Sequence, residues 1–443
     1  MSDSFSQLEH SYQEHATEKS EPDTVAHRHT PVPVKTPVVP DIEDTPFSHG
    51  LFDKDPATTA ARKGWLKISI FGVVVLFVMI WGVLPIYWAA IGRSFNNVHN
   101  LSGYVVDFDG GEIGQAVTRT FKNISGPQQL SWLILDASQF PGGPDEVAQA
   151  LLDHRCWAAV TINPQASTNL NASINTANGS YNTSQAVTAY ITSGRNENSL
   201  TSNLLQQVSS ILTAISHTFS LSSAQRLASR SDISTLLQTA PLLVIQPLGF
   251  TINDIRPFNV PVASAVDYVG LIYLVILAFV LTNQLLAARV ESGFEKCLRL
   301  RPLILLRLLW PVTLYFFVSL MYSLLSLAFG VPFGRKFGHA GFIIYWMMSW
   351  CTLDDTANVS VAFYPIEVLP AVFRYGFAMP FYNVSSTVRT IVFDTKNQIG
   401  LNFGVQFSWI LISCITLPIF QWLVRRRQIK AWETSQSAAR EKA

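Results

Sequence analysis

Four charged residues lie in a strongly apolar part of the chain, and their side chains are the ones that could do chemistry there. They are Asp354, Asp355, Glu367 and Arg374. A charged side chain is costly at membrane depth, so each position is a candidate for function, here in transport.

Two alternatives stand for each pair. Asp354 and Asp355 are adjacent, so on a helix their side chains point about 100° apart and cannot share one face. They would sense protons or cations if they line a polar path, whereas a helix break would leave them hydrated at an interface. Glu367 and Arg374 are seven residues apart and fall on nearly the same helical face. We expect them to pair, directly or through a neighbouring helix, as a structural contact or as part of a substrate site.

No pattern typical of an enzyme is present. The chain lacks a Gly-x-x-x-x-Gly-Lys-Ser/Thr loop, a Gly-x-Ser-x-Gly turn and a His-Glu-x-x-His pair. His154 lies near Asp153 and Cys156, but a surface turn before a strand explains these residues better than a thiol site. The four cysteines match no zinc spacing. We therefore expect neither catalysis nor a metal or other cofactor.

The composition indicates a membrane protein with attached soluble parts. Charged residues make up 14% of the 443, against roughly 25% in soluble domains, and the mean hydropathy is +0.25. The net charge of +1 gives no reason to expect nucleic acid as a partner. The first apolar run begins only near Leu66, so it is expected to act as an uncleaved anchor rather than a signal peptide.

The sequence predicts a mainly α membrane protein with six transmembrane helices and a luminal or extracellular α/β domain between the first and second. A disordered cytosolic tail is expected over 1–64, because this segment is polar and rich in Ser, Pro and Thr. The further parts are a first helix over 65–90, the α/β domain over 91–265, a five-helix bundle over 266–424 and a basic cytosolic tail over 425–443. The five helices are expected at about 266–286, 303–329, 341–363, 365–381 and 401–424, each near the length that a bilayer requires.

Charge sets the orientation. Arg62, Lys63 and Lys67 precede the first helix, and the run Arg425–Arg427 follows the last. An excess of basic residues marks the cytosolic side, so both termini are expected there.

The α/β domain is predicted from alternating strand and helix patterns. Strands are expected at Tyr104–Phe108, Trp132–Leu135, Trp157–Ile162 and Leu242–Ile245. Helices are expected over Glu112–Lys122, after Pro144, and over 204–219, where apolar residues recur every three or four positions. The same region carries Asn-x-Ser/Thr triplets, which fits a luminal location. The glycosylation candidates are Asn123, Asn171, Asn178 and Asn182, whereas Asn100 is expected to lie too near the membrane.

One stretch carries a family resemblance. Phe-Arg-Tyr-Gly-Phe-Ala-Met-Pro-Phe-Tyr-Asn at 373–383 continues through Val384, Val388, Arg389, Thr390 and Ile391, and Asn-Gln-Ile-Gly-Leu-Asn-Phe-Gly follows at 397–404. The stretch resembles the fungal nitrosoguanidine-resistance membrane protein family, over roughly residues 64–430. The motif positions are Arg374, Tyr375, Gly376, Pro380, Tyr382 and Asn383. More distantly, the arrangement is similar to the membrane domain of ABC-type exporters.

The resemblance implies a role in drug resistance, with export of small amphipathic compounds or lipids, and the plasma membrane as the location. An endomembrane such as the endoplasmic reticulum is the alternative location. With no ATPase domain, energy would come from a partner ATPase or an ion gradient. Membrane lipids, a small amphipathic substrate and a second copy of the chain are the other expected partners. The alternative function is a non-transporting scaffold or regulator, whose α/β domain binds a partner and affects lipid organisation.

Overall fold

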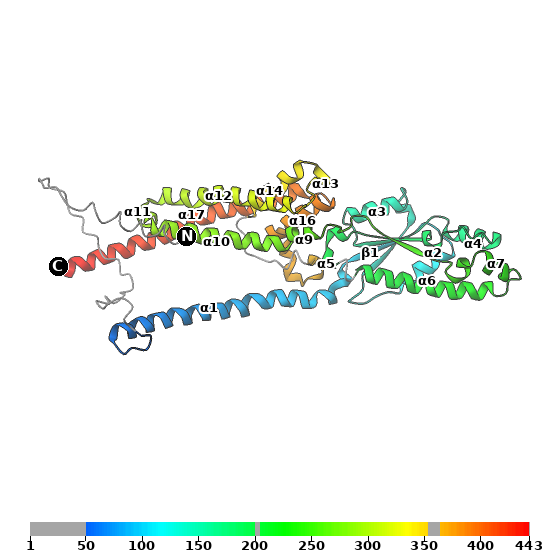
Figure 1. Cartoon of the computed structure of the whole chain (residues 1–443), viewed down its shortest axis with the longest axis horizontal. Coiled ribbons are helices and arrows are strands. Elements are labelled where there is room, and N and C mark those ends of the chain that lie inside the picture. Colours follow the sequence, from blue (N-terminus) through cyan, green and yellow to red (C-terminus); the bar gives the residue numbers. More distant parts are fainter. Residues whose placement is uncertain (1–49, 200–203, 353–363, 443) are drawn as a thin grey trace, which may run out of the picture. The chain divides into compact units, whose positions relative to one another are not determined.

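The computed structural model describes residues 50–199, 204–352 and 364–442 (Figure 1). The chain divides into two compact units, Met1–Trp81 and Gly82–Ala443. Helix α1 (Pro56–Ser94) begins in the first unit and ends in the second. It starts within the segment 1–64 that was predicted to be a disordered tail. Its apolar side chains, among them Phe71 and Val78, are exposed, as expected of a helix that contacts lipid.

A five-stranded sheet forms the centre of the α/β domain. Its strands are β1 (Ser102–Asp107), β2 (Ser131–Leu135), β3 (Ala158–Ile162), β4 (Val187–Ile191) and β5 (Phe250–Asp254). Their order is β2-β1-β3-β4-β5, and β3 and β4 are antiparallel while the other neighbours are parallel. β3 is buried along its whole length, which is typical of a strand covered on both faces.

Helices cover both faces of this sheet. One face packs against α2 (Glu112–Lys122), α4 (Ala166–Thr176) and α6 (Leu205–Leu227), and the other against α3 (Pro144–Leu152). In α2 the buried Ile113, Val117 and Phe121 recur every four residues, so they form one face of the helix. The predicted bounds of α2 are confirmed. The strand predicted at Leu242–Ile245 is wrong, because this segment forms the short helix α8 after α7 (Ile233–Thr239).

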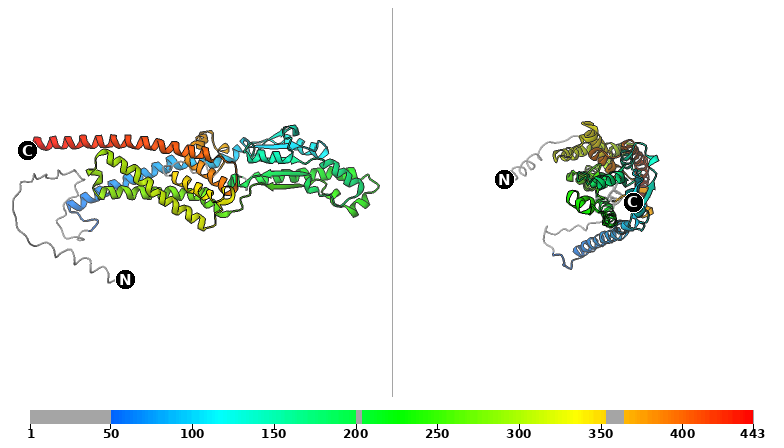
Figure 2. Two further views of the ribbon diagram at one scale, coloured as in Figure 1. Left: turned by 90° about the horizontal axis from the view of Figure 1, so that it is seen from above. Right: turned by 90° about the vertical axis from the view of Figure 1, so that its right-hand side faces the viewer.

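Four helices among the described residues are long and apolar enough to span a membrane. The candidate spans are Thr58–Gly82, Pro261–Glu291, Leu300–Ala328 and Ile399–Ser437. The last three correspond to α10 (Val269–Glu291), α12 (Leu300–Ala328) and α17 (Ile399–Lys442), the last of which extends beyond its span. Figure 2 shows the sheet beyond one end of these three helices, which we call the domain-side end. The loop with α11 (Phe294–Cys297) joins α10 to α12 at the opposite end.

Six spans are not confirmed. α14 (Ala340–Cys351) begins where the fourth span was predicted, but its 12 residues reach only about 18 Å, and the rest of that segment lies outside the described residues. The predicted fifth span is wrong, because it folds as the short 3-10 helices η7 (Ile366–Val368) and η8 (Ala371–Ala378). Leu369 and Met379, which precede prolines, are extended, as the proline ring requires.

The four candidate glycosylation sites are exposed on the α/β domain. If this domain is luminal, endoglycosidase treatment will shift the protein to lower apparent mass on a gel. Replacing Asn123, Asn171, Asn178 and Asn182 together with Gln will abolish the shift. Asn100→Gln is the matched control and will not change it, because the Asn100 amide donates to the Glu367 carbonyl. An untreated protein already at the lower mass would contradict the luminal placement.

Candidate functional site

Helix α16 (Pro380–Phe393) lies where the α/β domain meets the membrane helices. Pro380 occupies its first turn, where the absent N–H is not needed. Twelve of its residues are buried, and Phe381, Val388 and Ile391 pack in a core shared with α9 (Ser264–Asp267), α10 and α14. This burial fixes the polar residues of α16 in place.

The most deeply buried ion pairs of the described chain centre on Arg389 of α16. Its Nη2 lies 3.1 Å from Oε2 of Glu197, and its Nε lies 3.3 Å from Oδ2 of Asp267. A third contact runs from Nη1 to the carbonyl of Arg195, at 3.0 Å. Glu197 belongs to the α/β domain, whereas Asp267 is fully buried just before α10. One guanidinium therefore joins the domain to a membrane helix.

The electrostatics keep Arg389 charged. Burial alone would lower its pKa, but the carboxylates of Glu197 and Asp267 raise it above the ordinary value. Gly194 allows the close approach, because a Cβ there would lie 2.7 Å from Cβ of Phe393 and 2.8 Å from the Arg256 carbonyl.

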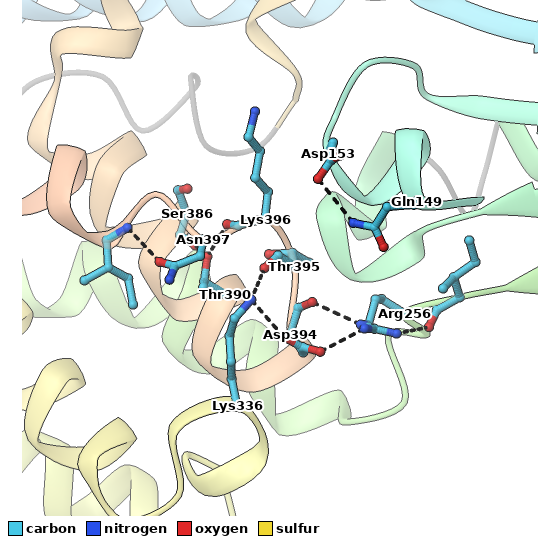
Figure 3. Close-up of polar contacts among 12 residues, drawn as sticks. Gln149, Asp153, Arg256, Lys336, Ser386, Thr390, Asp394, Thr395, Lys396 and Asn397 are labelled. Atoms are coloured by element: carbon cyan, nitrogen blue, oxygen red, sulfur yellow. Dashed lines mark hydrogen bonds and ion pairs between the residues drawn. The ribbon is translucent and has the colours of Figure 1, made fainter. Parts of the chain in front are cut away.

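A second ion cluster, centred on Asp394, lies at the end of α16 (Figure 3). The Asp394 carboxylate accepts from Arg256, which follows β5, and from Lys336 of α13 (Gly334–Phe337), both at 2.8 Å. Lys336 also donates to the Thr395 carbonyl at 2.6 Å. Asp394 has a φ of 54°, a left-handed conformation that Asp and Asn tolerate. We call the Arg389 and Asp394 clusters together the domain joint.

A small cavity of about 60 Å³ lies beside the domain joint, with Arg195 and Arg389 in its wall. Arg195 stacks over Trp157, with its guanidinium carbon 3.4 Å from the ring centroid. His154 also lines the cavity, and burial, aided by the nearby Arg195, lowers its pKa to about 2. Burial raises the pKa of Cys156 to about 12. A neutral imidazole and a protonated thiol do not make a nucleophile. The turn before β3 therefore explains His154 and Cys156 better than a thiol site does.

Glu367 and Arg374 line one pocket but are not joined by an ion pair among the described residues. The expected direct pair is therefore absent from this part of the chain. Asp354 and Asp355 lie outside the described residues, and their role stays a prediction.

The motif residues lie in different surroundings. Asn383 donates to the carbonyls of Phe377 and Met379, which fixes η8 against α16. Gly376 is buried, whereas Arg374 and Tyr375 are exposed. Tyr382 lines the cavity beside the domain joint.

The opposite end of the membrane helices has an ion cluster of its own, which we call the loop cluster. Glu295 of α11 pairs with Arg289 of α10, at 3.6 Å, and with Arg307 of α12. Arg307 also donates to Gln421 of α17. Arg425 donates to the Glu295 carbonyl at 3.1 Å. The loop cluster thus connects α10, α12 and α17.

Sequence reasoning missed the residues that matter most in the domain joint. Arg389 was noted only as part of the motif, and Asp267 and Glu197 were not singled out. The available signal was one charged residue in each of two apolar segments, Asp267 in one and Arg389 in the other. A buried charge needs a partner, so the two could have been paired.

Sheet, membrane helices and domain joint define the class: an integral, multi-pass membrane protein. Among the described residues, the strands of the sheet lie in the sequence between the candidate spans Thr58–Gly82 and Pro261–Glu291. The chain belongs to DUF3533, a family described as a protein of unknown function, whose sequence profile matches residues 72–354 and 356–415. It is similar to YJR015W, an uncharacterized endoplasmic reticulum membrane protein of Saccharomyces cerevisiae. The two are 23% identical over 426 residues, which is 84% of this chain and 83% of the yeast protein. No solved structure matches the chain.

The buried Arg389 cluster makes a strong prediction for stability. Arg389→Gln leaves two buried carboxylates without a cation, so we expect a loss of about 3–5 kcal/mol. Adding Asp267→Asn should restore part of that loss, because it removes one of the stranded charges. Lys336→Gln, in the more exposed Asp394 cluster, should cost under about 1 kcal/mol.

These losses are measurable by SDS-induced unfolding of the detergent-solubilised protein. Arg119→Gln, at an exposed position of α2, is the control. Equal losses for Arg389→Gln and Lys336→Gln would contradict the assigned difference in burial.

His154 predicts acid sensitivity. Its pKa is about 2 in the fold and about 6.5 in the unfolded chain. Between these values only the unfolded chain takes up the proton, so stability falls as the pH drops below about 6.5. His154→Asn suits the φ of 62° and should reduce the fall in melting temperature between pH 7 and pH 5. An unchanged difference between the two pH values would show that His154 does not contribute.

Proposed function

We propose that this protein exports, or helps to export, small amphipathic compounds or lipids across its membrane, and thereby contributes to resistance. The observation that carries the proposal is the placement of ion clusters at both ends of the same helices. The domain joint binds α10 and α16 at one end, and the loop cluster binds α10, α12 and α17 at the other. Opening a path alternately to each side requires contacts of this kind, which separate and re-form as helices move.

Buried hydroxyl groups between the two clusters support a polar path. Ser319, Ser323 and Ser326 of α12 are buried, as are Tyr345 and Ser349 of α14. The indoles of Trp346 and Trp350 donate to carbonyls of α12, so α14 packs against the same region of α12. In this conformation the hydroxyls are enclosed, and separation of α14 from α12 would expose them to a passing polar group.

The proposed orientation puts the domain joint outside the cytosol. The basic residues of the loop cluster then fall on the cytosolic side, in agreement with the rule for basic loops. The protein acts without catalysis of its own, so a partner ATPase or an ion gradient supplies energy. Asp354 and Asp355 are the candidates for proton coupling. The name of the yeast relative supports the endoplasmic reticulum, and the family resemblance supports the plasma membrane.

A scaffold function is the second candidate, and the edge strand β2 favours it. β2 pairs with β1 on one side only, and its Leu133 and Ile134 are exposed. An exposed apolar edge strand is a site where a partner protein can add a strand. In that case the α/β domain would hold a partner, and the helices would only anchor it.

Export from cells distinguishes the two functions. Cells lacking the endogenous protein would express the wild type, Arg307→Gln, or Arg256→Gln with Asp394→Asn, and would be loaded equally with a fluorescent amphipathic compound. We expect each variant to change the efflux rate at least about fivefold. Arg307→Gln weakens the loop cluster and the double variant weakens the Asp394 cluster, while the apolar core stays intact. Arg119→Gln is the control for charge, and membrane abundance is measured in parallel.

Efflux that is the same with and without the protein would overturn the export proposal. If resistance is then lost in Leu133→Lys, the scaffold function is supported instead.

A further inference from the structure

A pocket of about 310 Å³ lies between the end of α1 and the segment that contains η7 and η8. Among the described residues, its lining includes Arg93, Asn97, Asn100, Glu367 and Arg374. Two amides hold its walls together. Asn97 donates to the Val368 carbonyl and Asn100 to the Glu367 carbonyl, both at 3.0 Å. The pocket is therefore built before any ligand enters.

Its two arginines have no partner among the described residues, and a carboxylate lies with them in the lining. Arg93 and Arg374 make neither an ion pair nor a hydrogen bond among these residues. The Glu367 carboxylate accepts no hydrogen bond there, and it also lines the cavity beside the domain joint, where its charge acts on Arg195. The arginines come from segments far apart in the sequence, and they face one cavity together with a carboxylate. This arrangement matches a ligand that carries both a negative and a positive charge.

Charge and helix length place the pocket near the boundary of the membrane, beyond the end of the candidate span Thr58–Gly82. Arg93 is the first charged residue after Lys67, and the 25 residues between them form a helix of about 37 Å, slightly longer than the bilayer core of about 30 Å. η8 is tied to a membrane helix, since the Trp409 indole of α17 donates to the Ala378 carbonyl at 2.7 Å. Val372 and Phe377 of η8 are 69% and 47% exposed, which suits contact with acyl chains.

We propose that this pocket binds a phosphodiester that carries a primary ammonium group, in the form of the headgroup of a phosphatidylethanolamine lipid. Arg93 and Arg374 bind the phosphate, because guanidinium groups match its geometry and charge. Glu367 binds the ammonium. The lipid form follows from the position at the membrane boundary and from the exposed apolar side chains of η8.

The lining also discriminates between headgroups. No aromatic ring of the described residues lines the pocket, so a quaternary ammonium such as choline lacks the cage that favours it. A headgroup with phosphate alone places a second negative charge beside the Glu367 carboxylate without an ammonium group to offset it. If the protein exports lipids, this site names the class of lipid, and in that respect it rests on the proposed function. The binding itself does not depend on export, because it is measured without transport.

Native mass spectrometry of the full-length protein in detergent tests the site. The protein is titrated separately with phosphatidylethanolamine, phosphatidylcholine and phosphatidylglycerol of the same acyl chains. We expect one phosphatidylethanolamine to bind about tenfold more tightly than either of the others. Arg93→Gln and Arg374→Gln should each weaken it about tenfold, in line with a charge-assisted hydrogen bond. Both side chains are exposed, so the variants should fold, and Arg119→Gln is the matched control.

Glu367→Gln provides the decisive comparison. It should remove the preference for phosphatidylethanolamine over phosphatidylcholine, because only the ammonium contact is lost. Unchanged preference in this variant, or unchanged affinity in both arginine variants, overturns the site. Competition by soluble glycerophosphoethanolamine at the same concentration as the lipid would overturn the lipid as its source. If the arginine variants lose lipid binding but retain normal efflux, the export proposal stands and the lipid site is not needed for it.

Discussion

The burial of the Arg389 charge is the constraint on which the rest of this structure depends. A guanidinium taken out of water is stable only when carboxylates and carbonyls surround it closely. Here these groups come from different parts of the chain: Glu197 and the Arg195 carbonyl from the α/β domain, and Asp267 from the start of a membrane helix. Neither part can satisfy the charge alone. Domain and membrane helices are therefore obliged to meet at α16.

The two glycines near the domain joint follow from this requirement. Gly194 lets the domain approach Phe393, and Gly270 lets α10 approach the Tyr322 hydroxyl of α12, which any side chain at 270 would block. By contrast, Asp394, Arg256 and Lys336 are each partly exposed, and water can replace their contacts at small cost. The domain joint thus combines one cluster that is hard to break with another that is easy to break.

Local patterns predicted much of the fold. The bounds of α2, the strands β1 to β3 and four membrane helices could all be read from periodicity, charge and length. Leu242–Ile245 could not, because a four-residue apolar run fits a short helix as well as a strand. The segment 365–381 is apolar enough for a span, but Pro370 and Pro380 interrupt it. The domain joint was beyond reach for another reason: Arg389 meets partners 122 and 192 residues away, and one sequence contains no record of such pairings.

α17 forms one helix of 44 residues from Ile399, beside the domain joint, to Lys442, with Pro418 inside it. At 1.5 Å per residue it is a rod of about 66 Å. Near one end, the Asn402 amide donates to the Thr387 hydroxyl of α16. A movement of α16 would therefore move this end of α17. Such a rod acts as a lever. A tilt of only about 5° about its domain-side end would carry the far end sideways by roughly 6 Å. A small rearrangement around Arg389 would therefore arrive, enlarged, at the opposite face of the membrane.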